Sequence, residues 1–221
     1  MSRSAIAGAV VSLLVATGAS GQTRHVSRPS VPIPVTQGFS LGAYTVLGSG
    51  VTVLGPDIDG PFRTSMGEGF GVRVGYGFNS RMMVFASADL VRQPSEADYI
   101  QGSMGLSHLE IGGRLTFPAP RRRLVPYVAA VIGKRGVSAS NGYYAEHDER
   151  FSLRMSGTEI GAGGGILYAF SPALSLDAGL FASQGKFDHA TYRGDINDQG
   201  VLDVHGSTTM RLKVGFQWTP R

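Results

Sequence analysis

The ten residues Thr209–Trp218, with the sequence TMRLKVGFQW, decide the fold of this chain. Apolar side chains alternate strictly with polar or small ones: Met210, Leu212, Val214, Phe216 and Trp218 share one face, and Arg211, Lys213, Gly215 and Gln217 share the other. A period of two is typical of a β-strand, because a helix would mix the two sets around its axis. Ten residues are also the length of a strand that crosses a bilayer at a tilt of about 45°.

The same pattern recurs along the chain. Alternation is clear in 69–78, 108–117, 159–170 and 174–183, and weaker in 37–47, 81–91 and 124–134. The connections alternate in length, being short at 79–80, 118–122 and 171–173 and long at about 48–66, 92–103, 135–152 and 188–205. Bacterial outer-membrane barrels combine short periplasmic turns with long external loops. We therefore predict an all-β fold for residues 37–218: a single eight-stranded antiparallel up-and-down transmembrane β-barrel with short periplasmic turns and long extracellular loops.

Aromatic residues are placed at one end of every second predicted strand. In the barrel topology these strand ends all lie at the periplasmic interface, where outer-membrane barrels carry an aromatic girdle. The predicted girdle consists of Tyr76, Phe78, Phe117, Tyr168, Phe170, Phe216 and Trp218.

The face opposite the apolar one should line the lumen. Only 16% of the residues are Asp, Glu, Lys or Arg, and the ones on this face balance in charge. The candidates for lumen ion pairs are Arg73, Arg114, Arg211 and Lys213 on the positive side and Asp89, Glu110, Glu159 and Asp177 on the negative side. Buried charges must be paired, and we expect Lys213 to pair with Glu159 or Asp177. The many lumen glycines leave room for long side chains, which predicts a plugged lumen rather than a wide pore.

The N-terminus has the three parts of a secretory signal: Arg3, an apolar stretch and a run of small residues. We predict a signal peptide at 1–21, a periplasmic leader at 22–36 and a C-terminal tail at 219–221. The chain has no cysteine, which excludes disulfide scaffolds and thiolate chemistry. A net charge of +4 without a basic stripe gives no support for nucleic acid as a partner.

Few residues indicate chemistry. His108 lies in the lumen row near Glu110 and is interpreted as a histidine bonded to a carboxylate. We predict no catalytic residue, no cofactor and no metal site. A weak calcium candidate is the EF-hand-like run with Asp195, Asn197 and Asp203, but its twelfth position is Gly206 instead of the glutamate that calcium needs.

Four stretches resemble the small outer-membrane β-barrel domain family: GVRVGYGF at 71–78, VPYV at 125–128, FSPALSLDAG at 170–179 and VGFQW at 214–218. This family includes the OmpA transmembrane domain, OmpX and OmpW relatives. The resemblance implies location in the outer membrane, with outer-membrane lipid and lipopolysaccharide as surroundings. Such barrels usually end on an aromatic residue that the outer-membrane assembly machinery recognises, so this machinery is an expected partner.

Three functions remain open at this point. The first is a structural or surface-interaction role without enzyme activity, with a lumen plugged by ion pairs and an unknown extracellular ligand bound by the loops. The second, which the resemblance to OmpW relatives implies, is a narrow channel for ions or small hydrophobic solutes. The third is an outer-membrane lipid-modifying enzyme.

Overall fold

The computed structural model describes residues 37–54, 62–63, 66–94, 100–101, 103–118, 123–144, 149–194, 199–201 and 206–220. The predicted signal peptide, the leader, Arg221 of the predicted tail and the calcium candidates Asp195, Asn197 and Asp203 lie outside these residues. None of the described residues forms a helix long and apolar enough to cross a membrane.

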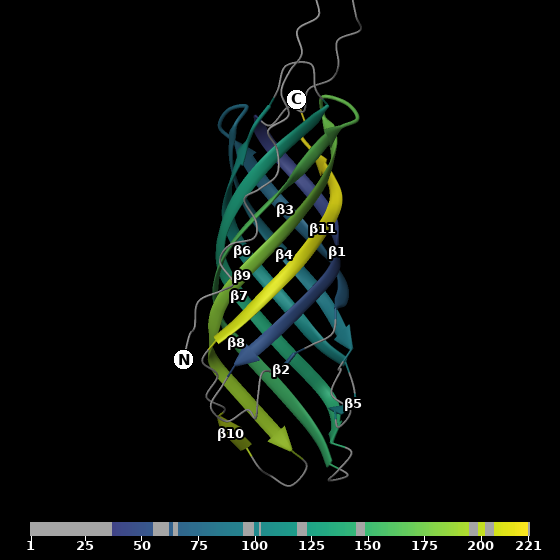
Figure 1. Ribbon diagram of the computed structural model, residues 1–221, viewed down its shortest axis with the longest axis vertical. Helices are drawn as coiled ribbons and strands as arrows, with labels where there is room; N and C mark the ends of the chain where they lie inside the picture. Colours follow the sequence, from purple (N-terminus) through teal and green to yellow (C-terminus); the bar gives the residue numbers. More distant parts are fainter. Residues whose placement is uncertain are drawn as a thin grey trace, which may run out of the picture. The chain divides into compact units, whose positions relative to one another are not determined.

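Eight long antiparallel strands form the barrel, as the alternation predicts (Figure 1). They are β1 (Gly38–Leu54), β3 (Gly67–Gly77), β4 (Met82–Pro94), β6 (Ser103–Thr116), β7 (Leu124–Tyr144), β8 (Glu149–Ala169), β9 (Leu174–Gly194) and β11 (Gly206–Trp218). Each pairs with the next along the chain, and β11 returns to pair with β1 from Leu41↔Trp218 to Leu54↔Gly206. The sheet is thereby closed on itself.

The two ends of the barrel differ. At the end where β11 finishes, the turns are tight: Asn79 Oδ1 accepts hydrogen bonds from the backbone N–H groups of Arg81 and Met82, and Ser171 Oγ accepts from those of Ala173 and Leu174. The other end carries the short strands β2 (Phe62–Arg63), β5 (Ile100–Gln101) and β10 (Gln199–Val201), seen at the lower end in Figure 1. We call these the turn end and the loop end.

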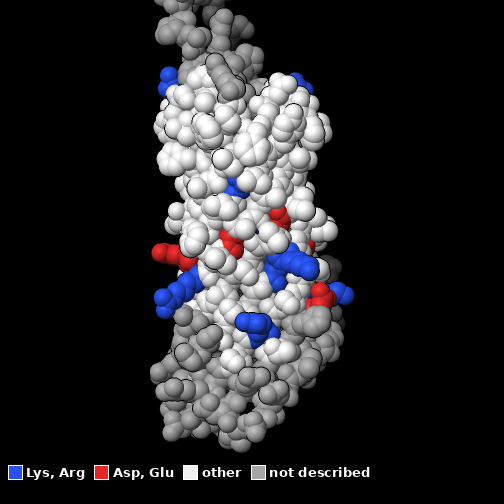
Figure 2. All heavy atoms as spheres, turned by 180° about the vertical axis from the view of Figure 1, so that it is seen from behind, with Lys and Arg blue, Asp and Glu red and all other residues white. Residues whose placement is uncertain are grey.

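An uncharged band surrounds the barrel between these ends. Every charged side chain whose exposure is described is either buried in the lumen or lies at a band edge: Arg81 and Arg123 near the turn end, and Glu68, Arg92, Lys134, Arg154, Lys186 and Asp188 toward the loop end. On the face that Figure 2 displays, blue and red side chains gather in a belt below a largely white surface. Eleven residue steps separate Arg123, directly before β7, from Lys134 on β7. At about 3.3 Å per residue and a tilt of about 45° they span about 26 Å, close to the height of the apolar band of outer-membrane barrels.

The seven aromatic residues predicted as a girdle lie at the turn end. Six of its members have outward side chains that are about half exposed, and Tyr168 is partly covered. The rings contact one another, with centroids 5.6 Å apart for Tyr76 and Phe78, 5.2 Å for Tyr168 and Phe170, and 6.2 Å for Phe170 and Phe216. Amphipathic and apolar rings at this level suit the membrane interface.

The boundaries predicted for the long connections are wrong in one respect. Strand pairing continues through most of 135–152 and 188–205, so that Tyr144 still pairs with Glu149 and Thr191 with Arg154. The physical reason is a reversal of polarity beyond the charged belt. There the outward side chains are polar, such as Ser138 and Ser156, while apolar side chains turn inward and form a buried cluster that includes Val137 and Met155. The alternation persists, but its apolar residues no longer mark the outer face.

Apolar side chains on both faces explain the weak alternation of the first segment, because Tyr44 and Val46 are buried while Leu41 and Leu47 face outward. Beyond this segment, β1 contains a β-bulge. Gly48 has a φ of 73°, a left-handed conformation that glycine adopts without steric cost. The register of β1 shifts here, so that Tyr44 and Val46 point inward before the bulge, and Ser49 and Val51 after it. The inward positions thus change from even to odd numbers within one strand.

The outward position of Leu212 gives the first prediction. Leu212 lies on β11 between Leu47 and Leu180 and is 40% exposed on the uncharged band. Leu212→Arg should lower the free energy of unfolding by about 2–4 kcal/mol, or less if the site lies near an interface, because the guanidinium must enter the hydrocarbon. Urea unfolding in lipid vesicles measures this loss.

Two variants serve as controls. Leu212→Ala should cost less, since it removes only apolar contact, and Thr208→Arg, on the same face at the level of the charged belt, should be close to neutral. Equal losses for Leu212→Arg and Thr208→Arg would contradict the assigned band.

Candidate functional site in the barrel lumen

All eight predicted ion-pair residues point into the lumen, and none is more than 9% exposed. They come from β3, β4, β6, β8, β9 and β11, because the inward positions of neighbouring strands meet across a narrow barrel. They form three groups rather than one continuous network.

Asp177 on β9 is the centre of the first group. Its Oδ2 accepts from Arg73 Nη1 at 2.7 Å and from Arg114 Nη2 at 2.6 Å, and its Oδ1 accepts from Tyr127 Oη at 2.6 Å. Arg114 also donates from Nη1 to Gln217 Oε1 at 2.9 Å. One carboxylate therefore serves two guanidinium groups, with a phenol and an amide completing the polar contacts.

The second group holds two carboxylates between two cations. Lys213 Nζ lies 2.7 Å from Asp89 Oδ2 and 3.2 Å from Glu110 Oε2. Arg211 donates from Nη1 to Asp89 Oδ2 at 3.1 Å and from Nη2 to Glu110 Oε1. The prediction that Lys213 pairs with Glu159 or Asp177 is wrong. The partners across the lumen depend on how far the strands are staggered around the barrel, which alternation along one strand does not reveal.

Glu159 belongs to a third group. Its Oε1 lies 2.6 Å from His108 Nδ1, and its Oε2 accepts from Ser183 Oγ at 2.6 Å. His108 is thus bonded to a carboxylate as expected, although the carboxylate is Glu159 and not the nearby Glu110.

Arg135 is a lumen cation that the sequence analysis missed, because its position was assigned to a long connection. It is 1% exposed and donates from Nη1 to Thr209 Oγ1 at 3.3 Å and from Nη2 to the Ser207 carbonyl at 3.1 Å. With Arg135 the described lumen holds five Lys or Arg side chains against four carboxylates, so the equal tally expected from the sequence is wrong. The period of two continues through positions 131, 133, 135 and 137, and this pattern could have identified Arg135 as an inward residue.

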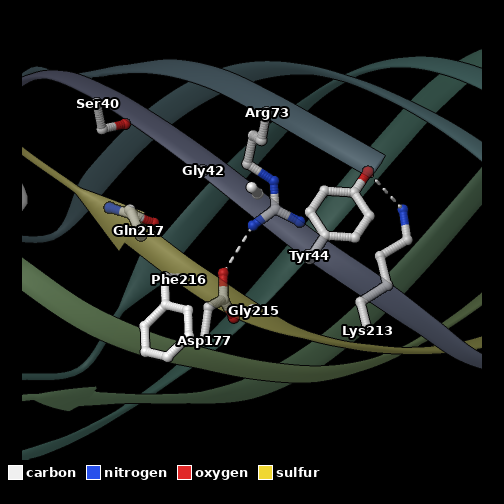
Figure 3. Close-up of a pocket in the computed structure, with 10 residues that line it drawn as sticks. Ser40, Gly42, Tyr44, Arg73, Asp177, Lys213, Gly215, Phe216 and Gln217 are labelled. Carbon is white, nitrogen blue, oxygen red and sulfur yellow. Dashed lines mark hydrogen bonds and ion pairs between the residues drawn. The ribbon is translucent and has the colours of Figure 1, made fainter. Parts of the chain in front are cut away.

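Aromatic rings also fill the lumen, beside the cations. Figure 3 shows the Tyr44 ring between the Arg73 guanidinium and the Lys213 ammonium, whose distances to the ring centroid are 5.3 and 4.9 Å. Arg114 lies 4.0 Å from the Tyr127 centroid, and Arg135 lies 4.9 Å from that of Phe187. These separations fall within the range of cation–π attraction, so the rings stabilise the charges that they separate.

Lumen glycines make room for these rings. A Cβ atom at Gly71 would lie 2.5 Å from the ring of Tyr44, at Gly163 2.6 Å from Phe181, and at Gly112 2.7 Å from Phe85. The excess of glycine in the sequence thus has a steric cause. The space beside the lumen glycines, which we expected charged side chains to fill, is also occupied by aromatic rings.

The lumen is filled both at the turn end and toward the loop end. At the turn end, the cavity lined by Ser40, Tyr44, Arg73, Asp177 and Gln217 has a volume of about 10 Å³. Such a volume has room for about one water molecule. Toward the loop end, the space is occupied by a buried apolar cluster: Tyr44, Val46, Val51, Val91, Met104, Leu106, Val137, Ala139, Met155 and Phe187.

One group of side chains has the composition of a metal site. Ligand atoms of His108, Glu110 and Glu159 lie within 4.8 Å of one another. Their oxygens are already engaged, however, by Arg211 and Lys213 on Glu110 and by His108 and Ser183 on Glu159. A cation placed here would compete with the Arg211 guanidinium, so the arrangement fits an ion-pair cluster better than a metal site.

The separation of the groups gives the second prediction. Lys213→Met leaves Asp89 and Glu110 to share Arg211 alone, and breaking a buried pair in this way should cost about 3–5 kcal/mol of unfolding free energy. Adding Asp89→Asn should restore part of this loss, because it removes the surplus charge. Adding Asp177→Asn should instead increase the loss, since it removes the carboxylate that both Arg73 and Arg114 contact.

Double-mutant cycles by urea unfolding in lipid vesicles measure both combinations. If Asp177→Asn rescued Lys213→Met as well as Asp89→Asn does, the assigned grouping of the charges would be incorrect.

No family model and no curated protein matches this chain. Solved structures do match it. Neisserial surface protein A (NspA) superposes with a TM-score of 0.56 at 16% identity, covering 82% of this chain and 97% of that one. OprG from Pseudomonas aeruginosa gives 0.52 at 13% identity (84% and 97% covered), and AlkL in DMPC bilayers gives 0.52 at 11% identity (89% and 96% covered). At these identities the similarity concerns the fold. With its closed sheet, its uncharged band and its girdle, the chain is a small eight-stranded β-barrel of the outer-membrane type.

Proposed function

We propose that this barrel is a closed structural and surface-interaction protein of the outer membrane, which neither conducts solutes nor catalyses a reaction. The filled lumen is the observation that carries the proposal. Three groups of paired charges cross it, and an apolar cluster closes it toward the loop end.

Conduction through this lumen would require several contacts to break together. An ion that passes Asp177 must displace Arg73 or Arg114, and one that passes Asp89 must displace Arg211 or Lys213. Leaving buried charges without their partners is costly. Beyond them, the side chains of the buried cluster are apolar except for the Tyr44 hydroxyl, which already contacts Asp89 and Lys213. These features favour a closed barrel over the narrow channel.

Among the described residues, the arrangement of the lumen hydroxyl groups and His108 does not favour a hydrolase. Nucleophilic catalysis by serine needs a histidine within hydrogen-bond reach of the hydroxyl. Here Ser183 and His108 both contact Glu159 rather than each other. Ser107, adjacent to His108, points to the opposite face and donates to the Gly136 carbonyl.

The long strands favour an interaction surface at the loop end. From Lys134 to Tyr144, β7 continues mostly as paired strand beyond the charged belt. At about 3.3 Å per residue and a tilt of about 45°, this extension rises about 23 Å along the barrel axis. A paired extension of this kind holds the described strand ends at Tyr144 and Glu149 away from the lipid headgroups, where a partner can reach them.

The third prediction concerns conductance. The mature protein, refolded and inserted in planar bilayers, should give no conductance steps above the lipid baseline, because paired charges and a buried apolar cluster fill the part of the lumen that the structure describes. A porin inserted under the same conditions provides the positive control.

Two results would contradict the proposal. Reproducible steps whose amplitude changes in Asp177→Asn would support the channel, and a change in the mass of lipid A after expression of the protein would support the enzyme.

A further inference from the structure

A row of three outward side chains lies in register across β7, β8 and β9. Lys134 pairs with Thr158, and Thr158 pairs with Lys186. All three are exposed, and neither lysine forms an ion pair among the described residues. Two strand spacings place the lysine backbones about 10 Å apart. Their flexible stems can therefore bring both ammonium groups to one anionic group above Thr158.

A groove of about 480 Å³ on the outer wall begins at this row. Small outward residues form its floor, namely Ala88, Ser107, Gly136 and Ser156, and larger outward side chains flank it, namely Phe70, Val72, Leu90, Leu109 and Lys134. The inward positions Gly71, Asp89, His108 and Arg135 of the same strands complete its lining. The outward side chains of this region are thus mostly apolar at one end of the groove, with a lysine at the other.

The register shows how the groove runs relative to the membrane. Val72, Ala88, Leu109, Lys134, Thr158 and Lys186 form one continuous row across six strands. Because barrel strands are tilted by about 45°, a row across them also climbs along the barrel axis. Val72 lies within the uncharged band, whereas Lys134 and Lys186 lie in the charged belt. The groove therefore leads from the hydrocarbon level to the headgroup level.

We propose that this groove is a binding site for lipid A of the outer leaflet. An acyl chain lies along Phe70, Leu90 and Leu109, and a glucosamine phosphate is bound by Lys134 and Lys186, with the Thr158 hydroxyl as a further donor. A phosphorylated, multiply acylated lipid matches both ends of the groove, which neither a free anion nor an uncharged lipid does.

The surrounding charges favour an anion. Arg154 lies on the same outward face of β8, four residues beyond Thr158, and is exposed. Asp188, two residues beyond Lys186, is the exposed carboxylate of this region and opposes the anion. Three cations against one carboxylate leave the region positive. The proposal does not depend on whether the lumen conducts.

Binding can be measured by native mass spectrometry of the folded protein in detergent, titrated with bisphosphorylated lipid A. Lys134→Gln combined with Lys186→Gln should weaken binding about 30-fold, taking the usual contribution of a lysine at an anionic lipid surface for each residue. The matched control is Arg81→Gln with Arg123→Gln, which removes two exposed cations at the turn end and should leave the affinity unchanged.

The apolar half of the site can be tested separately, with variants that leave every charged residue in place. Ala88→Phe fills the floor of the groove and should weaken lipid A binding severalfold. Ala162→Phe, which adds the same ring elsewhere on the exposed wall, should not. Heat-modifiable migration in SDS gels confirms that each variant is folded before titration.

Competing lipids distinguish the source of the phosphate. Lipid A without phosphates, phosphatidylglycerol and inorganic phosphate should each bind more weakly than bisphosphorylated lipid A and lose little in the lysine variant. Equal affinity of the lysine variant and the wild type, equal binding of dephosphorylated lipid A, or equal displacement by phosphatidylglycerol or inorganic phosphate would overturn the proposal.

Discussion

The pairing of β11 with β1 is the constraint on which the rest of this structure depends. Hydrocarbon offers no hydrogen-bond partner to a backbone N–H or C=O group, so a sheet in a bilayer must have no free edge. Closure of eight strands encloses a narrow lumen and turns every second side chain into it. The apolar outer wall, the filled interior and the split between turn end and loop end all follow from closing the sheet.

Closure also requires that the interior be filled. The lumen side chains fill the interior in successive layers along the barrel axis. The Asp177 group lies near the turn end, the Asp89 and Glu110 group lies beyond it, and an apolar cluster lies toward the loop end. Cations lie against aromatic rings, and glycines stand opposite those rings because a Cβ would collide with them. The same strands reverse polarity at the charged belt, being apolar outward in the membrane and apolar inward beyond it. Each part of the strand therefore buries its apolar residues away from water.

Alternation in the sequence predicted the fold, the outward positions within the uncharged band and the inward position of all eight candidate charges. It could do so because successive side chains of any β-strand point to opposite faces of the sheet. It did not predict contacts that depend on the relation between strands. Lys213 contacts Asp89 and Glu110 on β4 and β6, strands that only the stagger of the closed barrel brings opposite β11. Arg135 and the ends of β7, β8 and β9 were missed because outward residues beyond the belt are polar. The continuation of β1 beyond Leu47 was missed because the bulge at Gly48 changes which positions point inward.

Single-cysteine labelling along β11 tests whether the barrel is closed and its lumen filled, since the chain has no native cysteine to interfere. A spin label placed at each of positions 209 to 218 in lipid vesicles reports its collision rate with oxygen, which partitions into lipid, and with a water-soluble nickel chelate. A closed, filled barrel should give high oxygen accessibility at 210, 212, 214 and 216, and low accessibility to both reagents at 211, 213, 215 and 217. Loss of the period of two would contradict the assigned faces, and high accessibility to the chelate at the inward positions would contradict the closed lumen.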